Sequence, residues 1–307
     1  PRGKMIGGCS AHNGMVYVRG NPNDYQRWAS FGLKDWSYEK VLPYFKKIET
    51  WSEGQNEYRG GTGILPVNQS KNKNPLFDAF VKSAGEAGYK INQDMNGKDQ
   101  EGFGMYDVTI HKGERASISK YYLNPAKKRK NLKVVVKGHV QQINFDGKKT
   151  TGIAYWHNNE LISVKANKEV ILSAGAIGSP HILQVSGIGN EKKLQELGIN
   201  IVHHNPNVGQ NLQDHLMLRP VYKVKNIKTL NKTINSFFGK MLIGMEFVFF
   251  RKGVMTMGAS QLCGFAKSDK SKETPDLQFH VQPISTDKLG GASLHNFDAF
   301  TPTVANL

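Results

Sequence analysis

Cysteine is scarce in this chain: Cys9 and Cys263 are the only two among 307 residues. Two thiols cannot build the disulfide framework that holds small secreted domains together, so a hydrophobic core must hold the fold. Apolar residues make up 38% of the chain, enough for such a core, which excludes disordered, collagen-like and disulfide-scaffold classes. At roughly 150 residues per domain, the length predicts two domains.

Long apolar runs are missing as well. No run reaches about 18 residues, which excludes a transmembrane helix. The first residues, Pro1–Lys4, are basic and lead at once into the glycine-containing run Met5–Cys9, which does not resemble a secretory leader. The sequence also lacks an initiating methionine, so we expect it to be an internal fragment of a longer protein. The expected localisation is the cytoplasm or the surface of a membrane.

Arginine is scarce although the chain is basic: eight of the 41 basic residues are arginine, and the formal net charge is +16. Proteins that read nucleic acids usually gather cations on one face and use arginine for bidentate contacts. Here the lysines are scattered, and the one dense cluster, Lys127–Lys130, lies in a polar stretch. We interpret this cluster as a solvated loop, with anionic lipid or nucleic acid as the alternatives. We expect no nucleic-acid partner.

Spacings typical of a metal site or a hydrolase are absent too. The sequence contains no H-x-x-x-H pair, no cysteine pair with a histidine, and no G-x-S-x-G elbow. His111 and the His203–His204 pair stand in polar contexts that are typical of surface groups. We therefore expect no metal site.

Four segments have the signals of helices. Ser37 is a favourable N-cap, and the apolar residues that follow it fall on one stripe. Asp24 is a fair N-cap for a shorter helix, and Pro75 suits a first helical position. The expected helices are 25–29, 37–48, 74–87 and 192–197.

The middle and the end of the chain are rich in strand signals. Asp146–Gly147 separates two apolar runs and predicts a hairpin over 140–156. Other strands are expected at 133–136, 161–164, 221–224, 260–266, 276–281 and 300–304. A buried strand at 169–173 runs into the glycine turn 174–178, which is typical of a nucleotide-binding α/β unit. This turn lacks the G-x-G-x-x-G spacing and the following acidic residue, so it is not a dinucleotide fingerprint.

The segment 236–250 is dense in Phe, Leu, Met and Ile and is interrupted by Lys240 and Glu246. It is too short to span a bilayer. We expect a buried helix, and a membrane-surface helix is the alternative.

Residues 3–28 form the glycine-containing run GKMIGGCSAHNGMVYVRGNPNDYQRW. Paired glycines let backbone amides come within contact of a flat ring, because no Cβ stands in the way. Asn13–Gly14 adds a polar group and a second close approach. A glycine pair alone indicates only a flexible loop, but the length and order of this run are more specific.

The run resembles the first signature of the glucose–methanol–choline (GMC) family of FAD-dependent oxidoreductases. The second signature is matched by GAIGSPHILQVSGIG at 175–189, and NVGQNLQDHLM at 207–217 resembles a third family segment. Smaller agreements are WSYEKVLPYFKKIE at 36–49 and the ERAS run that begins at Glu114. The resemblance spans essentially the whole chain.

The resemblance implies an α/β fold with two domains, α+β in composition. These are an FAD-binding Rossmann-like domain and a substrate domain with an antiparallel sheet and helices. Residues 1–35 and 115–217 would belong to the FAD-binding domain, and 36–114 and 218–307 to the substrate or cap domain. The family's G-x-G-x-x-G unit is expected before Pro1, and the rest of the substrate domain after Leu307.

The resemblance also implies which residues contact FAD. Those in the first signature line the flavin, Val140 holds the adenine end through its backbone, Gly175 packs the strand–helix turn, and Asp214 and His215 lie close to the cofactor. The complete set is Gly7, Gly8, Cys9, His12, Asn13, Gly14, Met15, Val16, Val140, Gly175, Asp214 and His215.

His12 is a special case. The sequence Cys-Ser-Ala-His-Asn resembles the choline-oxidase subgroup, in which the histidine is bonded covalently to a ring methyl of the flavin. The same residue could instead be a hydrogen-bonded histidine of the core, so both interpretations stay open here.

The activity implied is oxidation of the CH–OH group of a choline-like or other primary alcohol, with hydride transfer to flavin N5. The family's catalytic histidine is expected beyond Leu307, so we assign no catalytic residue and do not expect the chain alone to turn over. Gln261 and Gln282 are candidate substrate contacts. The electron acceptor is open between oxygen and a quinone or other carrier. The alternatives are a non-catalytic binding protein that keeps the flavin fold and, more remotely, a nucleic-acid-binding module.

Overall fold

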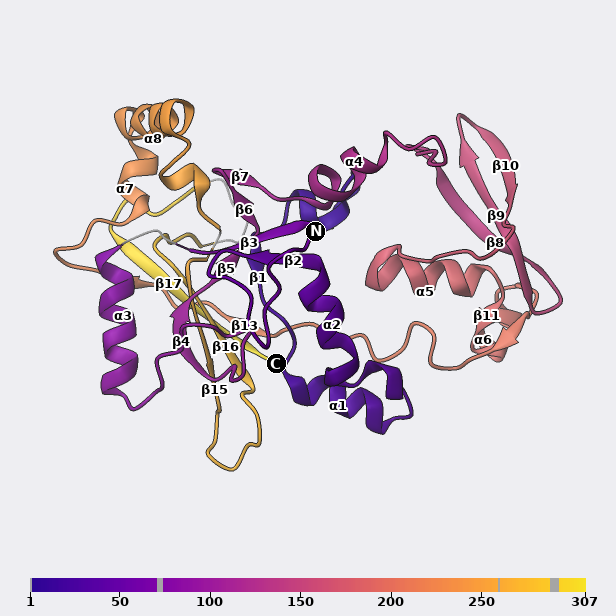
Figure 1. Cartoon of the computed structure of the whole chain (residues 1–307), viewed down its shortest axis with the longest axis horizontal. Coiled ribbons are helices and arrows are strands. Elements are labelled where there is room, and N and C mark those ends of the chain that lie inside the picture. The colour runs from indigo at the N-terminus through magenta and orange to yellow at the C-terminus, as the bar shows by residue number, and fades with distance from the viewer. Residues whose placement is uncertain (1, 71–73, 259, 288–292) are drawn as a thin grey trace. The chain divides into compact units, whose positions relative to one another are not determined.

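The computed structural model describes residues 2–70, 74–258, 260–287 and 293–307 (Figure 1). The chain folds as two compact units. The first contains residues 1–130 and 215–307, and the second contains 131–214. The two domains that the family resemblance predicts are defined by cofactor binding and substrate binding, and their boundaries differ from those of these two units. The domain assignment therefore stays a prediction.

A six-stranded antiparallel sheet dominates the first unit. Its main order is β13-β17-β16-β15-β4, and β14 also pairs with β17. The bounds are β4 Gly102–Met105, β13 Met217–Leu218, β14 Tyr222–Lys223, β15 Leu262–Ala266, β16 Leu277–Gln282 and β17 Ala299–Asn306. All five residues of β15 are buried, which identifies it as a central strand covered on both faces.

Helix α3, Pro75–Glu86, packs on this sheet. Asn74 caps it, because its side chain accepts a hydrogen bond from Leu76 N at 3.0 Å, and Pro75 occupies the first position. Phe77 is 2% exposed and packs against Leu262 and Val281 of the sheet. This contact forms one of the main apolar clusters of the first unit.

A smaller mixed sheet carries the start of the chain. Its order is β1-β5-β3-β2, in which only β2 and β3 are parallel. The bounds are β1 Val16–Tyr17, β2 Glu49–Trp51, β3 Leu65–Gln69 and β5 Asp107–Val108. The two-stranded hairpin of β6, Ile110–His111, and β7, Glu114–Arg115, follows β5.

The remaining helices of the first unit connect these sheets. The α-helices are α1 Pro22–Ser30, α2 Tyr38–Ile48, α4 Asn124–Ala126, α7 Leu230–Asn235 and α8 Phe237–Phe250. The short 3-10 helices are η1 Gly8–Ala11, η2 Lys34–Trp36 and η4 Val254–Thr256, and η3 Ser119–Leu123 is a π-helical turn.

The second unit contains a three-stranded antiparallel sheet and helix α5. The sheet has the order β10-β9-β8, with bounds β8 His139–Asp146, β9 Lys149–His157 and β10 Glu160–Lys165. Helix α5, Gly175–Val185, is followed by β11 Ile188–Gly189, α6 Glu191–Glu196 and β12 His203–His204. Ile143 N donates to Ser186 Oγ at 2.8 Å, which connects the sheet to the end of α5.

The expected α/β fold class is confirmed, since helices and sheets are mixed along the chain. The helices at 37–48, 74–87 and 192–197 and the hairpin about Asp146–Gly147 are confirmed in place. The first helix begins earlier than expected. Asn21 caps it, and Asp24 Oδ2 accepts from Asn21 N at 3.0 Å to complete a capping box.

Two expected strands are wrong. Neither 133–136 nor 169–173 forms a strand, and Ile171 is 79% exposed. A strand requires a hydrogen-bonded neighbour, and no described strand pairs with either segment. The helix that was expected after the second segment is present as α5.

The expected burial of the helix at 236–250 is also wrong. The helix forms as α8, but Phe237 and Phe249 are 78% and 72% exposed, and Gly239 is its one buried residue. Its apolar face lacks a cover within the described residues. Among all helices of the described residues, none has the length and apolar character needed to cross a membrane.

Candidate functional site

Residues 7–16 belong to the first sequence motif and form a turn, which we call the signature loop. Gly7 has φ +93° and Gly8 has φ +55°, both left-handed, and the chain then closes the 3-10 turn η1. A Cβ at Gly7 would lie 3.1 Å from Ser119 Oγ, whereas a Cβ at Gly8 would meet nothing within 4 Å. The two glycines therefore serve different needs: one allows a close approach within the protein, and the other keeps the outer side of the loop bare.

The outer side of the signature loop is open. Cys9, His12, Asn13 and Gly14 are all exposed, and the loop ends where β1 begins at Val16. The ring of His12 is exposed among the described residues, and both interpretations of this histidine, a covalent flavin link and a core histidine, stay predictions. A loop that presents backbone and short side chains to one side can accept a flat ligand.

Met15 is held in a strained conformation at the end of this turn. Its φ of +62° is unusual for a residue with a side chain and costs on the order of 1–3 kcal/mol. Its N–H donates to Asn13 Oδ1 at 3.1 Å, and its carbonyl accepts from Thr109 N at 2.8 Å and from Thr109 Oγ1 at 3.2 Å. Hydrogen bonds on both sides of Met15 therefore hold the conformation.

Arg115 contacts the same loop from β7. Its Nη1 donates to Asn13 Oδ1 at 2.6 Å and to Ser10 O at 3.3 Å. Burial lowers the pKa of this guanidinium from its ordinary value, though arginine stays charged in proteins. No sequence pattern predicts a role for Arg115 by itself, and the one signal that includes it is the ERAS run.

A buried cluster of charges stands directly after β1 and anchors it. Arg59 is fully buried and donates to Glu49 at 3.0 Å, Asp94 at 2.6 Å and Asp107 at 2.7 Å. Arg19 donates to Glu49 at 2.6 Å. Burial raises the pKa of Asp94, even though Arg59 acts in the opposite direction.

The cluster also fixes neighbouring groups. For Arg59, burial acts to lower the guanidinium pKa, but Asp107 and the other carboxylates outweigh it, so the net shift is upward. Burial is the main reason that the pKa of Tyr17, in β1, is raised to about 12. The end of the signature loop is thus attached to a rigid, buried network.

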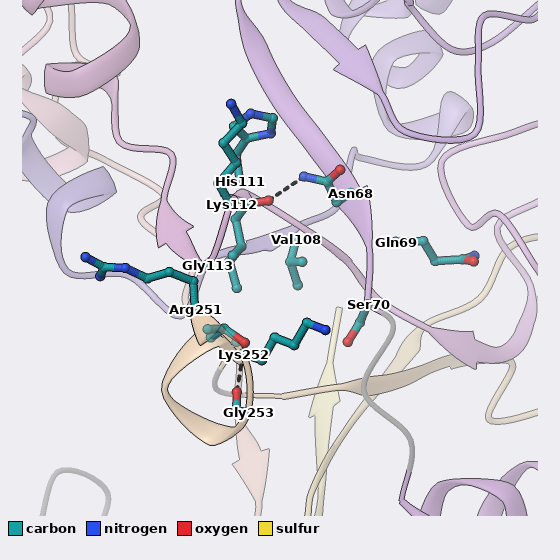
Figure 2. A pocket seen from close by; sticks show the side chains of 13 residues that line it. Asn68, Gln69, Ser70, Val108, His111, Lys112, Gly113, Arg251, Lys252 and Gly253 are labelled. Carbon is teal, nitrogen blue, oxygen red and sulfur yellow. Dashed lines mark hydrogen bonds between the residues drawn. The ribbon is translucent and has the colours of Figure 1, made fainter. Parts of the chain in front are cut away.

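A pocket of about 510 Å³ lies beside the signature loop in the first unit (Figure 2). Val108 and Ile110 of its wall share an apolar cluster with Met15, and a Cβ at Gly258 would lie 3.1 Å from Gly14 O. The basic side chains that line it are Lys112, Arg251 and Lys252, and His111 lies beside them. Asn68 Nδ2 donates to Ile110 O, which joins two residues of the pocket wall; this is the dashed line at Asn68 in Figure 2.

The candidate substrate contacts Gln261 and Gln282 lie in or next to the six-stranded sheet. Gln261 is 0% exposed; its Oε1 accepts from Ser70 at 2.6 Å, and its Nε2 donates to Gly258 O at 2.7 Å. Gln282 donates to Ser260 Oγ at 3.1 Å. These bonds are structural, and the roles of the two residues toward substrate stay predictions.

Three predicted residues fall in the second unit. Val140 in β8 adjoins a bulge, because it pairs with Tyr155 while Gln142 already pairs with Ala154. The extra residue of the bulge is Gln141, while Val140 itself is paired, so the role of Val140 at the adenine end stays a prediction. Gly175 has φ +86° and opens α5, and a Cβ there would meet nothing within 4 Å. Asp214 is the last residue of this unit and is exposed.

His215 belongs to the first unit, and its Nδ1 donates to Asn306 O at 3.0 Å, because a carbonyl oxygen only accepts. The predicted set is therefore divided between two units, and its convergence on one cofactor stays a prediction. Within the described ranges, no group of three or more His, Cys, Asp or Glu residues is placed to hold a metal ion.

Comparisons with known proteins extend this description. A family model described as "GMC oxidoreductase" matches residues 1–217. The chain is 42% identical over 301 residues to an oxygen-dependent choline dehydrogenase of Brucella anthropi, covering 97% of this chain and 54% of the relative. An oxygen-dependent choline dehydrogenase 1 of Chromohalobacter salexigens is 41% identical over 311 residues, covering 100% and 55%. The chain thus spans about half the length of the curated relatives it matches.

Solved structures agree on the fold. The formate oxidase of Aspergillus oryzae matches with a TM-score of 0.87 at 22% identity, over 99% of this chain and 59% of that one. A fungal aryl-alcohol oxidase matches with a TM-score of 0.81 at 19% identity, over 98% and 62%. At these identities the likeness supports the fold alone.

Proposed function

Since the chain belongs to the GMC oxidoreductase family of FAD-dependent enzymes, we propose that the full-length protein oxidises the CH–OH group of a small alcohol, choline or another primary alcohol. The observation that carries the proposal is the signature loop, which is open on one side and held by hydrogen bonds on the other. When bound, FAD would supply the hydride acceptor at flavin N5.

The residues present fit a flavin. Gly8 has no Cβ to hold a ring away, and Cys9, His12, Asn13 and Gly14 are exposed on the same loop, where they offer backbone and side chains to a ligand. In the second unit, the backbone of Val140 would bind the adenine end. The exposed start of α5 at Gly175 would offer free N–H groups to negative charge.

Anaerobic titration of the purified full-length protein tests the activity. We expect choline or a related primary alcohol to bleach the flavin absorbance near one equivalent per site. A yellow protein that no alcohol reduces would favour the alternative, a non-catalytic binding protein that has kept the flavin fold.

We propose further that His12 forms a covalent bond with a ring methyl of the flavin. The exposed imidazole on the open side of the loop supports this proposal. In trichloroacetic acid the wild-type protein should carry its yellow colour into the pellet, while the His12→Ala variant should release it. Colour in the wild-type supernatant would refute the bond.

The proposed electron acceptor is oxygen, because both relatives described above carry the name oxygen-dependent. A quinone or another carrier is the alternative. Peroxide formed in air, compared with reduction of an artificial dye under argon, distinguishes the two: an oxidase forms stoichiometric peroxide, and a dehydrogenase reduces the dye much faster than oxygen.

The proposed localisation is the cytoplasm, with peripheral contact to an anionic membrane through α8. The exposed apolar side chains of α8 are accompanied by Lys240 within the helix and Lys252 just after it, two exposed lysines that would pair with anionic headgroups. We expect the full-length protein to sediment with phosphatidylserine vesicles and not with phosphatidylcholine vesicles.

The variant Phe249→Glu should weaken this sedimentation. Phe31→Glu, which changes an equally exposed phenylalanine after α1, is the matched control. Equal sedimentation of the two variants, or none for the wild type, would contradict membrane contact through α8.

A further inference from the structure

We propose that Arg115 is a positioning residue that fixes the side-chain amide of Asn13, so that its Nδ2 group faces the flavin as a hydrogen-bond donor. The inference rests on the proposed function, because it concerns the same cofactor loop. Its basis is the arrangement of donors around Asn13 in the described chain.

Two groups converge on one atom of Asn13. Arg115 Nη1 lies 2.6 Å from it, and the backbone N–H of Met15 lies 3.1 Å from it. A guanidinium and a backbone N–H can only donate, so the shared atom must be the amide oxygen Oδ1. The opposite orientation would place two donors against the NH₂ group. The Nδ2 group consequently occupies the other side of the amide, in a side chain that is exposed.

Arg115 also holds the preceding part of the loop. Its Nη1 donates to Ser10 O at 3.3 Å, and Ile118 N donates to Ser10 Oγ at 3.0 Å. Ser10 Oγ in turn donates to Gly7 O at 2.6 Å. The short segment 115–118 therefore contacts both the beginning and the middle of the signature loop.

The backbone that follows Arg115 is held in place by burial and by a hydrogen bond. Ala116 and Ser117 are buried, and Ala116 N donates to Thr109 O at 2.9 Å. Thr109 is the residue that binds the Met15 carbonyl, so the guanidinium and the strained turn share one support.

The charge of Arg115 is directed at the loop. The neighbouring acid, Glu114, pairs with Lys120 and lies 3.8 Å from Arg251. A half-buried positive charge close to the flavin, together with an oriented donor, favours the negative charge that reduced flavin carries. Loss of Arg115 should therefore lower the midpoint potential of the flavin.

The experiment uses the full-length protein in a His12→Ala background, so that a covalent bond cannot mask dissociation. Arg115→Met removes all donors and the charge, and Arg115→Lys keeps the charge and a single donor nitrogen in place of the planar guanidinium. Arg129→Met, an exposed arginine outside the loop, is the control. The readouts are the midpoint potential of the bound flavin and the FAD dissociation constant.

We expect Arg115→Met to weaken FAD binding by about tenfold, which corresponds to about 1.4 kcal/mol, because the Asn13 amide is then no longer held with its donor toward the cofactor. The midpoint potential should fall, and Arg115→Lys should recover part of both effects. Arg129→Met should match the parent. An Arg115→Met protein with the parent's potential and affinity would overturn the proposal.

A second measurement separates positioning from general stability. In an Asn13→Ala background, Arg115→Lys should no longer change the potential, because the amide that Arg115 orients is gone. An equal effect with and without Asn13 would overturn the positioning role, including where Arg115→Met fails to fold. A parent protein that binds no FAD would instead refute the proposed function.

Discussion

Removal of the Arg59 side chain is the strongest perturbation that the structure offers. Arg59 is fully buried, bonds to three carboxylates at 2.6–3.0 Å, and stacks 4.1 Å from the Trp51 ring. Arg59→Met keeps part of the packing and leaves Arg19 alone with three acids. Breaking a buried ion pair from one side costs about 3–5 kcal/mol, which is a large part of a stability of roughly 5–15 kcal/mol.

Thermal unfolding of the full-length protein measures this cost. At about 2–4 °C per kcal/mol for a domain of this size class, the apparent midpoint should fall by roughly 6–20 °C at pH 7. The loss should shrink at acidic pH. Burial raises the pKa of Asp94 although Arg59 acts in the opposite direction, so without Arg59 this pKa rises further; the penalty is small while Asp94 is protonated and grows as pH rises.

The matched control is Arg27→Met, which changes an exposed arginine of α1 and should move the midpoint very little. A fall of less than about 2 °C for Arg59→Met, or a loss independent of pH between 4 and 7, would refute the view of the cluster as a charge-balanced anchor for β1.

The remaining predictions concern the loop and one histidine. Gly7→Ala should lower both the stability and the flavin content, because the φ of +93° at Gly7 disfavours Ala and the new Cβ would lie 3.1 Å from Ser119 Oγ. Gly54→Ala is the control, since Gly54 has φ +95° and open space around it. Equal flavin content in the two variants would contradict the close-approach argument. Burial lowers the pKa of His280 below 6.5 in the folded state, and the nearby His215 lowers it further. The unfolded chain then binds more protons, so stability is lost as pH falls below about 6.5. Urea unfolding of His280→Gln should show a shallower loss between pH 7 and 5, and an unchanged slope would rule out this assignment.

Sequence patterns located most elements that depend on local signals. The cap at Asn74 and the turn at Asp146–Gly147 act within a few residues, so their helix and hairpin were predictable. The strands at 133–136 and 169–173 failed because strand formation depends on a distant partner. The predicted burial of helix α8 was wrong for a related reason. Composition indicates that a helix is apolar, but it does not indicate which other segment covers that helix.

The site was predictable where a motif names its residues and not where it depends on tertiary contacts. The glycine run identified the signature loop, but no spacing connects Asn13 to Arg115, 102 residues away. The same holds for the buried cluster, in which Arg59 meets Asp107 across 48 residues. Such pairs arise from the sheet that brings β1, β2 and β5 together.

The absorbance spectrum of the purified full-length protein tests the central claim most directly. The account predicts a yellow protein with close to one FAD per chain, whose colour is lost on anaerobic addition of a primary alcohol. A colourless protein that takes up no FAD after refolding with an excess of the cofactor would contradict it.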